Sequence, residues 1–271
     1  MEVLIVENAA AAAMVGAGRV AELLAIKPNA VLGLATGSTS IAVYQELVSR
    51  YRRNHISFAN VVTFNLDEYV GLISGSPQSY RSFMDRELFD HVDICIENTH
   101  FPACHPGDNP RLVGSEYEAK IIDAGGIDLQ ILGIGRNGHI GFNEPGSSLS
   151  SRTRIKTLTE STVHDNSRLF SENDFQPHLA MTMGIATILE ARRTILFATG
   201  KHKAAAVRDA IEGPLSARCQ ASALQLHERA TFVLDEAAAS LLEYKDYYQW
   251  ANAENEALMR EFGHFYELQG F

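Results

Sequence analysis

Short runs of wholly apolar residues alternate with longer amphipathic or alanine-rich stretches along this chain. We expect strands at residues 3–6, 31–35, 61–66, 127–132, 194–198 and 230–234, and helices at residues 8–26, 41–52, 80–89 and 201–211. Strands that are apolar throughout need cover on both faces, which is typical of parallel sheets joined by crossover helices. The pattern therefore predicts an α/β fold, with an open, mostly parallel, doubly wound, Rossmann-like sheet and helices on both of its faces.

The domain organisation follows from what interrupts this alternation. We find no internal repeat, low-complexity tract or Pro/Gly-rich linker, so we expect a single α/β catalytic domain over residues 1–271. The longest polar stretch, residues 148–173, is a candidate lid over a binding site. Residues 235–271 are expected to form a C-terminal helical tail after the last strand.

Composition and charge narrow the classes of partner. The chain has 23 Lys and Arg against 33 Asp and Glu, a net charge of −10, which argues against nonspecific nucleic-acid binding. We expect no membrane partner and a cytoplasmic location, because no apolar stretch approaches a bilayer span and the N-terminus lacks a signal-peptide pattern. Cys95, Cys104 and Cys219 have no close metal-ligand spacing and are expected to be reduced thiols.

The glycine-rich segment GIGRNGHIGFNEPG, residues 133–146, follows a predicted buried strand and carries His139 and Glu144. Ligands of open α/β sheets bind outside the carboxyl ends of the strands, so these side chains are candidates for chemistry. Histidine changes protonation near neutral pH and suits proton transfer between sugar oxygens, while a carboxylate can fix its tautomer. The alternative is a purely structural His-carboxylate pair on a rigid loop.

Asp67 and Glu68 follow another predicted buried strand. A carboxylate there is a usable base, most effective if burial raises its pKa. We expect one of the two to be a solvated neighbour, and the sequence hardly says which. The alternative for Asp67 is a cap of the next segment.

Residues 36–40, TGSTS, link a predicted strand to a predicted helix and offer hydroxyl and N–H groups at a helix N-terminus, an arrangement that holds phosphate. The lysine of a Walker sequence is absent, which disfavours ATP hydrolysis. The alternative is an ordinary helix cap. Arg168 and Lys203 could balance an anionic ligand or be solvated surface residues, and His227 is expected to be a packed core histidine.

Several long motifs in one order carry a resemblance over almost the whole chain. They are LATGSTS (34–40), VVTFNLDEYVGL (61–72), SYRSFM (79–84), GIGRNGHIGFNEPG (133–146), SRTRIKTLTEST (151–162), NSRLF (166–170), MTMGIATIL (181–189), TGKHKAAAVRDAIEG (199–213) and SALQLH (222–227). With them the sequence resembles the glucosamine-6-phosphate deaminase family, also called glucosamine-6-phosphate isomerases. The resemblance implies conversion of glucosamine 6-phosphate and water to fructose 6-phosphate and ammonia, in amino-sugar catabolism, with no metal or organic cofactor.

The resemblance also implies residue roles. His139 would open the sugar ring by passing a proton from O1 to O5, with Asn137 and Glu144 holding it, and Asp67 would move the proton between C2 and C1. The residues implied to bind the substrate phosphate are Gly37, Ser38, Thr39, Arg168 and Lys203. Some family members carry aspartate at the position of Asn137, so we expect an altered pH dependence here.

Allosteric members of this family are homohexamers activated by N-acetylglucosamine 6-phosphate at a subunit interface. Ser147, Arg154, Lys156 and Tyr247 match that site, so the resemblance implies activation and a homo-oligomer, expected to be a hexamer. The alternative for Arg154 and Lys156 is that they are alternating outward residues of a strand at 154–158.

Two competing functions stay open. The first is a hydrolase of the 6-phosphogluconolactonase type, which would use the same phosphate loop and histidine but needs no carbon base at Asp67. The second is a sugar-phosphate sensor without turnover, which intact Asp67, His139 and Glu144 disfavour.

Overall fold

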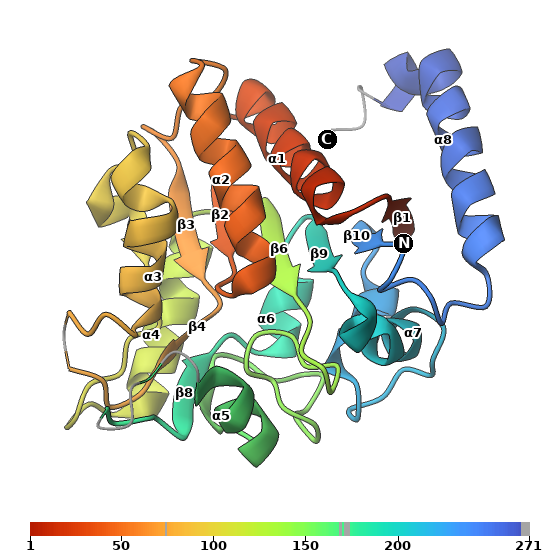
Figure 1. Ribbon diagram of the computed structural model, residues 1–271. Helices are drawn as coiled ribbons and strands as arrows, with labels where there is room; N and C mark the ends of the chain where they lie inside the picture. The colour runs from red at the N-terminus through yellow and green to blue at the C-terminus, as the bar shows by residue number, and fades with distance from the viewer. Residues whose placement is uncertain (74, 168–169, 171–173, 267–271) are drawn as a thin grey trace.

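A seven-stranded sheet forms the centre of the computed structural model, which describes residues 1–73, 75–167, 170 and 174–266 (Figure 1). All neighbouring strands in it are parallel, in the order β1-β10-β9-β6-β2-β3-β5. Their bounds are β1 Glu2–Val6, β2 Val31–Leu34, β3 Val62–Asn65, β5 Thr99–His100, β6 Leu129–Gly133, β9 Thr194–Ala198 and β10 Ala230–Asp235. The predicted parallel α/β sheet is confirmed.

The strand order changes direction between β2 and β6. From β2 the chain moves outward to β3 and β5, whereas from β6 it moves the other way, to β9 and β10. The loops that leave these two strands therefore diverge and open a crevice at the carboxyl ends of the sheet, where ligands of such folds bind. These are the loops that contain the TGSTS and GIGRNGHIGFNEPG motifs.

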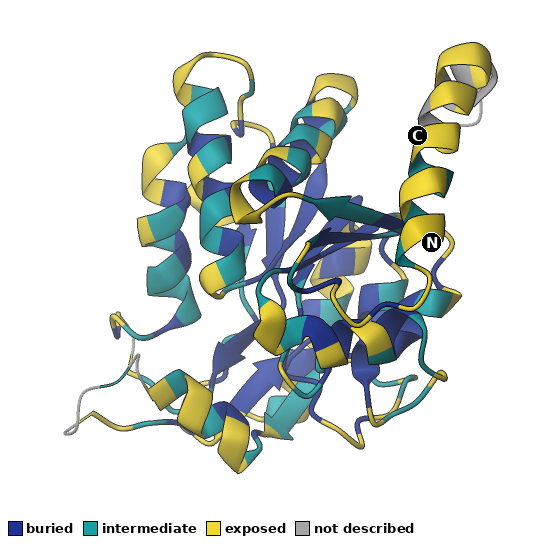
Figure 2. Cartoon of the chain, turned by 45° about the vertical axis from the view of Figure 1, so that its right-hand side comes forward, coloured by how far each residue is buried: buried dark blue, intermediate teal, exposed yellow. Residues whose placement is uncertain are grey.

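Helices surround the sheet, and their inner faces are buried against it while their outer faces are exposed (Figure 2). The α-helices are α1 Ala9–Ile26, α2 Ser38–Arg52, α3 Tyr80–Glu87, α4 Pro110–Asp123, α5 Glu160–Asn166, α6 Ile185–Leu189, α7 Ala204–Ile211 and α8 Lys245–Tyr266. Local chemistry fixes where several begin: Asn8 Oδ1 accepts the N–H of Ala11 at 2.9 Å, and Ser79 and Thr159 cap α3 and α5 in the same way.

The C-terminal helix begins later than predicted. Asp235 ends β10, and its carboxylate accepts the N–H groups of Gly200 and Ala238. These bonds hold the chain in a turn directly after the strand, and α8 starts only at Lys245.

A second sheet was not predicted. It has three antiparallel strands, β4 Asp67–Tyr69, β8 Leu179–Thr182 and β7 Arg154–Thr157, in the order β4-β8-β7. The polar segment 148–173 thus contains β7 and α5, while its residues 168–169 and 171–173 lie outside the described part of the chain. Its action as a lid stays a prediction.

The expectation that no apolar stretch approaches a bilayer span is wrong for α1. Among the described helices, α1 alone is long and apolar enough by length and composition to span a membrane, with a mean hydropathy of 1.6. In the structure it lies along the sheet, packing against α2 and β10, and Ala13, Ala17 and Val20 are buried in the core. Its apolar character reflects its many alanines, which allow it to pack closely against its neighbours.

Gly16 sets how closely α1 approaches the sheet. A Cβ atom at Gly16 would lie 2.4 Å from the ring of Phe197 on β9, whereas one at Gly18 would meet no atom within 4 Å. We expect Gly16→Ala to lower the free energy of unfolding by about 1–3 kcal/mol through overpacking. The matched Gly18→Ala should raise it by roughly 0.5–1 kcal/mol through helix propensity. Denaturant unfolding measures both, and equal stability of the two variants would contradict the packing described.

Candidate active site

The loop after β2 presents backbone N–H groups to the crevice. Gly37 has a φ of 125°, a conformation that favours glycine, and it is followed by α2, whose described first turn has neither a side-chain cap nor an acidic residue. The first N–H groups of a helix lack partners within it and favour anions. Gly37, Ser38 and Thr39 all line the same pocket.

Lys203 lines the same pocket from the opposite side, because it follows β9, beyond the point between β2 and β6 where the strand order changes direction. It immediately precedes α7, and its Nζ donates to the carbonyl of Ile134, after β6, at 2.6 Å. Its charge therefore lies between the loops after β6 and β9, on the pocket wall. Arg168, the other predicted phosphate ligand, lies outside the described residues.

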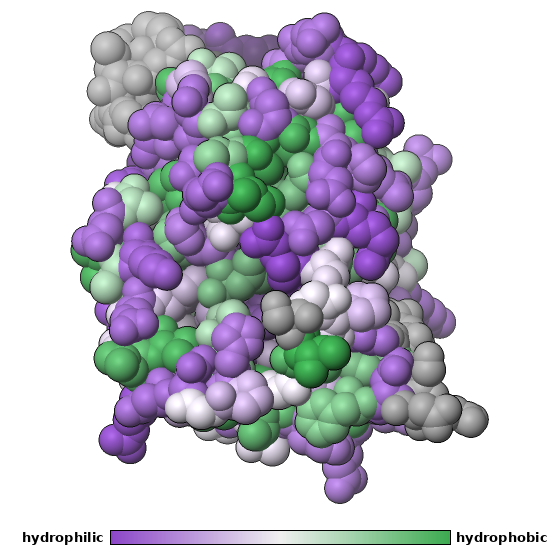
Figure 3. Space-filling view, turned by 90° about the vertical axis from the view of Figure 1, so that its left-hand side faces the viewer, coloured by the Kyte–Doolittle hydropathy of each residue, from purple (hydrophilic) through white to green (hydrophobic). Residues whose placement is uncertain are grey.

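The pocket has a volume of about 440 Å³ and brings together predicted residues from distant parts of the chain. Ser38, Thr39, Asp67, His139 and Lys203 all line it. A smaller cavity of about 280 Å³ lies beside α4, lined by Phe101, Leu112, Val113, Tyr117 and Lys120 among others, and none of the predicted site residues line it. Figure 3 shows the face on the side of α3 and α4, where hydrophilic and hydrophobic residues are interspersed.

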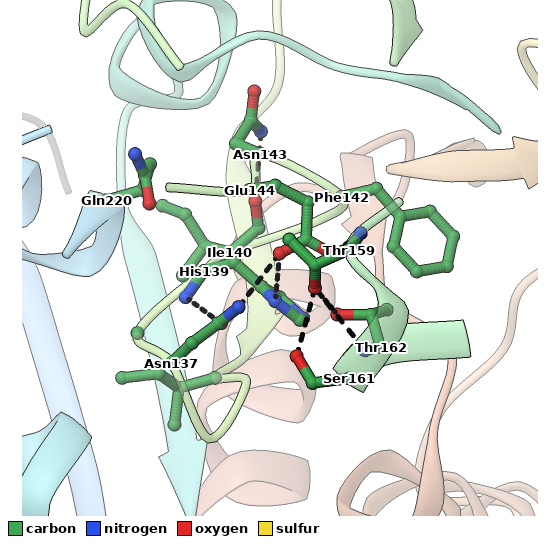
Figure 4. A network of polar contacts seen from close by, with 12 residues as sticks. Asn137, His139, Ile140, Phe142, Asn143, Glu144, Thr159, Ser161, Thr162 and Gln220 are labelled. Carbon is green, nitrogen blue, oxygen red and sulfur yellow. Dashed lines mark hydrogen bonds and ion pairs between the residues drawn. The ribbon is translucent and has the colours of Figure 1, made fainter. Parts of the chain in front are cut away.

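His139 and Glu144 form a close pair beneath the pocket (Figure 4). The Nδ1 atom of His139 lies 3.3 Å from Oε2 of Glu144, an ion-pair distance at which the ring N–H is not aligned well enough for a hydrogen bond. Gly135 makes room for the ring, since a Cβ there would lie 2.4 Å from it. His139 faces the pocket, whereas Glu144 is 1% exposed and lies behind it.

Burial, the largest single effect, would raise the pKa of Glu144, but the combined opposing effects of His139, Thr162 and Asn137 lower that pKa to about 2. Glu144 is therefore ionised at neutral pH. It can stabilise an imidazolium, so the pair is able both to accept and to donate a proton.

The side-chain amide of Asn137 both donates and accepts hydrogen bonds at the His139–Glu144 pair. Its Nδ2 donates to Glu144 Oε2 at 2.9 Å, and its Oδ1 accepts the backbone N–H of His139 at 3.2 Å. A carboxylate at this position could accept from His139 but could not donate to Glu144.

Asp67 and Glu68 are both buried on β4, at 5% and 6% exposure. Burial, reinforced by the negative charge of Glu68, raises the pKa of Asp67 well above its usual value, against a smaller opposing effect of the Phe142 N–H. A carboxyl group of raised pKa facing a pocket is a candidate general base. The alternative that Asp67 merely caps the next segment does not hold, because it begins a strand.

The expectation that one of these carboxylates is solvated is wrong. Glu68 accepts three backbone N–H groups, from Tyr69 at 2.8 Å and from Tyr80 and Arg81 at 2.9 Å each. Burial raises the pKa of Glu68, and these bonds oppose the rise. Glu68 thus serves as the N-terminal anchor of α3, which the sequence did not indicate.

The structure adds pocket residues that the sequence analysis did not single out: Tyr80, Arg136, Phe142, Asp165, Asn166 and His202. The rings of Tyr80 and Phe142 stack with centroids 5.8 Å apart. All of these except Asp165 lie in the motifs named above, so position within a motif was the available signal for them.

The four residues predicted to bind an activator do not meet within one chain. Arg154, on β7, donates to Asn143 Oδ1 at 2.8 Å, and the N–H of Ser147 donates to the Glu144 carbonyl, so both attach to the glycine-rich segment 133–146. Lys156 lies on the same strand as Arg154. Tyr247 is on α8, which packs on β1 at the far edge of the large sheet (Figure 1).

Other predicted residues are structural. His227 is buried, with Nε2 2.7 Å from the Ala191 carbonyl and Nδ1 accepting the N–H of Arg229, which confirms a packed core histidine. Cys104 and Cys219 are buried and Cys95 is exposed, all without disulfide bonds.

An anion-binding loop, an acid-base pair and a buried carboxylate that meet in one crevice define an enzyme site for a small anionic molecule. The chain belongs to the family described as glucosamine-6-phosphate isomerases/6-phosphogluconolactonase, whose model matches residues 6–233.

The names of individual relatives are more specific than the family description. The chain is 60% identical to a protein named glucosamine-6-phosphate deaminase from Colwellia psychrerythraea, over 97% of this chain and 98% of that one. It is 54% identical to one of the same name from Pseudoalteromonas translucida, over 99% and 100%. A solved monomeric glucosamine-6-phosphate deaminase matches with a TM-score of 0.85 and 43% identity, covering 89% of this chain and all of that one. A 6-phosphogluconolactonase from Leishmania guyanensis, 20% identical with a TM-score of 0.65, over 88% of this chain and 97% of that one, shares the fold.

Asn137→Asp tests the role of the amide. It replaces a 2.9 Å donor to Glu144 with a second carboxylate, so we expect the pKa of Glu144 to rise from about 2. The low pKa of Glu144 stabilises the folded state at neutral pH, so raising that pKa in the variant lowers the free energy of unfolding there. The difference from wild type shrinks as the pH falls and the carboxylates take up protons. Thermal unfolding of Asn137→Asp and wild type between pH 4 and 8 measures this, and a gap that widens toward low pH would contradict it.

Proposed function

We propose that this chain converts glucosamine 6-phosphate and water to fructose 6-phosphate and ammonia, as the names of its relatives indicate for those proteins. The observation that carries the proposal is that Asp67 and His139 line one pocket. Opening a sugar ring requires a group that exchanges protons between oxygens, and isomerisation requires a separate base for a carbon-bound proton.

The substrate phosphate would lie at the N-terminus of α2, against Ser38 and Thr39, with Lys203 and Arg168 balancing its charge. His139 takes the O1 proton and gives it to O5, while Glu144 stabilises the imidazolium and Asn137 orients the loop. These steps produce the open-chain aldehyde form of the amino sugar without a net gain or loss of protons.

Asp67 then removes the proton from C2, giving an enolamine, and returns a proton to C1. The product is an imine at C2, to which water adds, and ammonia leaves with the fructose 6-phosphate carbonyl formed. A carboxyl group whose pKa is raised by burial is a better base for this step than a solvated one.

We further propose activation by N-acetylglucosamine 6-phosphate at Ser147, Arg154 and Lys156, in a cytoplasmic homohexamer. Ser147 is buried with a hydroxyl that has no hydrogen-bond partner in the described structure, and burial lowers the pKa of Arg154. Since Tyr247 lies on the far edge of the same chain, it could join this site only from another subunit.

Asp67→Asn separates the deaminase from a lactonase. We expect it to abolish release of ammonia and fructose 6-phosphate, a loss of at least about 10³-fold, because the carbon base is gone. Enzyme-catalysed exchange between the α and β anomers of glucosamine 6-phosphate, followed by NMR, should persist, because ring opening depends on His139. Equal release of both products by wild type is the control, and product release that survives in Asp67→Asn, or wild-type hydrolysis of 6-phosphogluconolactone in place of deamination, would overturn the proposal.

Activation is tested at subsaturating substrate. We expect N-acetylglucosamine 6-phosphate to raise the rate of ammonia release several-fold, within the usual coupling range of about 5–150-fold. Lys156→Gln should weaken this response because it removes a charge that would hold the activator phosphate, while leaving the unactivated rate near wild type. A rate that does not change at any activator concentration would rule out the allosteric proposal and leave the deaminase intact.

A further inference from the structure

We propose that Thr182 is a positioning residue for Asp67: its hydroxyl accepts the N–H of Phe142 and so leaves the Asp67 carboxylate free to take the substrate proton. The inference rests on the proposed function, in which Asp67 is the carbon base. It assigns a purpose to β8, the middle strand of the small sheet.

Thr182 lies directly opposite Asp67 in the antiparallel pair of β4 and β8. Residues paired in this way have their side chains on the same face of the sheet, with Cβ atoms about 4.5–5.5 Å apart. Thr182 is 0% exposed, and Asp67 is 5% exposed and lines the pocket. The two side chains therefore lie together in a space from which water is almost excluded.

The glycine-rich segment passes close to both side chains at Gly141. A Cβ atom there would lie 2.9 Å from Thr182 Oγ1 and 3.4 Å from Asp67 Oδ2, so both oxygens face the same short stretch of backbone. The next N–H, that of Phe142, donates to Thr182 Oγ1 at 3.0 Å. The Thr182 hydroxyl in turn donates to the Met183 carbonyl at 3.3 Å, which leaves its lone pairs for the Phe142 N–H.

Thr182 and Asp67 compete for the Phe142 N–H. Phe142 is 4% exposed, so water cannot readily replace a lost acceptor. A carboxylate is a stronger acceptor than a hydroxyl, so an N–H released by Thr182 would turn to Asp67. This N–H already opposes the rise in the pKa of Asp67 that burial causes. By holding the N–H, the Thr182 hydroxyl keeps Asp67 a stronger base.

Asn143 keeps the glycine-rich segment on β8 independently of Thr182. Its side chain is 0% exposed, and its Nδ2 donates to the Met183 carbonyl at 2.8 Å. Loss of the Thr182 hydroxyl should therefore redirect one N–H without displacing His139 and Glu144, which contact each other within the segment.

Other titratable groups also surround Asp67. They are Glu68 and Tyr69 on β4, Tyr80 on α3, Tyr117 on α4 and His139 across the pocket. Burial raises the pKa of all three tyrosines, so they stay neutral in the pH range where a carboxyl group titrates. The three backbone donors to Glu68 do not involve Thr182. Removing the Thr182 hydroxyl should therefore act on Asp67 through the Phe142 N–H and not through these groups.

Thr182→Val keeps the side-chain shape and removes the acceptor. We expect release of ammonia and fructose 6-phosphate to slow roughly 10-fold, because Asp67 gains a hydrogen bond and becomes a weaker base. Carbon-13 NMR titration should show a lower pKa for Asp67 than in wild type, with its resonance identified by its absence from Asp67→Asn. In an Asp67→Asn background, Thr182→Val should leave anomer exchange of glucosamine 6-phosphate at the rate of its parent, because ring opening depends on His139.

Two further variants serve as comparisons. Thr182→Ser keeps the hydroxyl and should restore both the rate of product release and the pKa of Asp67. Thr187→Val is the matched control, because Thr187 is also a buried threonine, its hydroxyl bonds Glu118 at 2.6 Å, and it does not line the pocket. It should change neither quantity.

An Asp67 pKa in Thr182→Val that equals or exceeds that of wild type would overturn the inference. So would anomer exchange that falls in parallel with product release, or a Thr182→Ser variant that behaves like Thr182→Val. Thr182→Ala also lacks the hydroxyl and replaces Thr182→Val if that variant does not fold. Absence of product release by wild type would instead overturn the proposed function, while the titration of Asp67, which needs no turnover, would still decide the inference.

Discussion

The burial of three carboxylates at one end of the sheet, in a protein of net charge −10, is the constraint on which the site depends. The three carboxylates differ in which groups stabilise their buried negative charge. Glu68 receives three backbone N–H groups, and Glu144 receives the side-chain amide of Asn137 from its own loop and the N–H of Thr159 from the cap of α5. The buried charge of Asp67 is opposed by the negative charge of Glu68 and stabilised, among the described residues, only by the Phe142 N–H, so the pKa of Asp67 is raised. The carboxylate with the fewest hydrogen-bond donors is the one that faces the pocket, and this difference makes Asp67, rather than Glu68 or Glu144, the candidate base.

Sheet topology explains why these groups meet. The chain turns outward in opposite directions after β2 and β6, which leaves Gly37, a candidate for phosphate binding, and His139, a candidate for acid-base chemistry, on either side of one crevice. The small antiparallel sheet adds Asp67, which pairs with Thr182 on β8. A Cβ at Gly141 would lie 2.9 Å from the Thr182 hydroxyl and 3.4 Å from Asp67 Oδ2, so a glycine with a φ of 56° lets the glycine-rich loop pass close to this carboxylate.

Much of this arrangement could be predicted from local signals. The run 194–198 is the strand β9, and Asn8 marks the start of α1, because burial and capping act on neighbouring residues. The second sheet could not be predicted, because β4 is three residues long, two of them acidic, and its partner β8 lies far along the chain. The same holds for Glu68, since two of its three donors belong to α3, and for Thr159, whose N–H contact with Glu144 is tertiary. The pattern of apolar and polar residues predicts local secondary structure, whereas the donors that stabilise a buried carboxylate come from residues far along the chain.

The most direct test of this account is the protonation of Asp67 itself. Carbon-13 NMR titration of the aspartate carboxyl groups, compared between wild type and Asp67→Asn, would identify its resonance by its disappearance. The account predicts one carboxyl that titrates well above the ordinary aspartate value of about 3.9 in wild type and is missing from the variant. An Asp67 resonance that titrates at or below that ordinary value would contradict it.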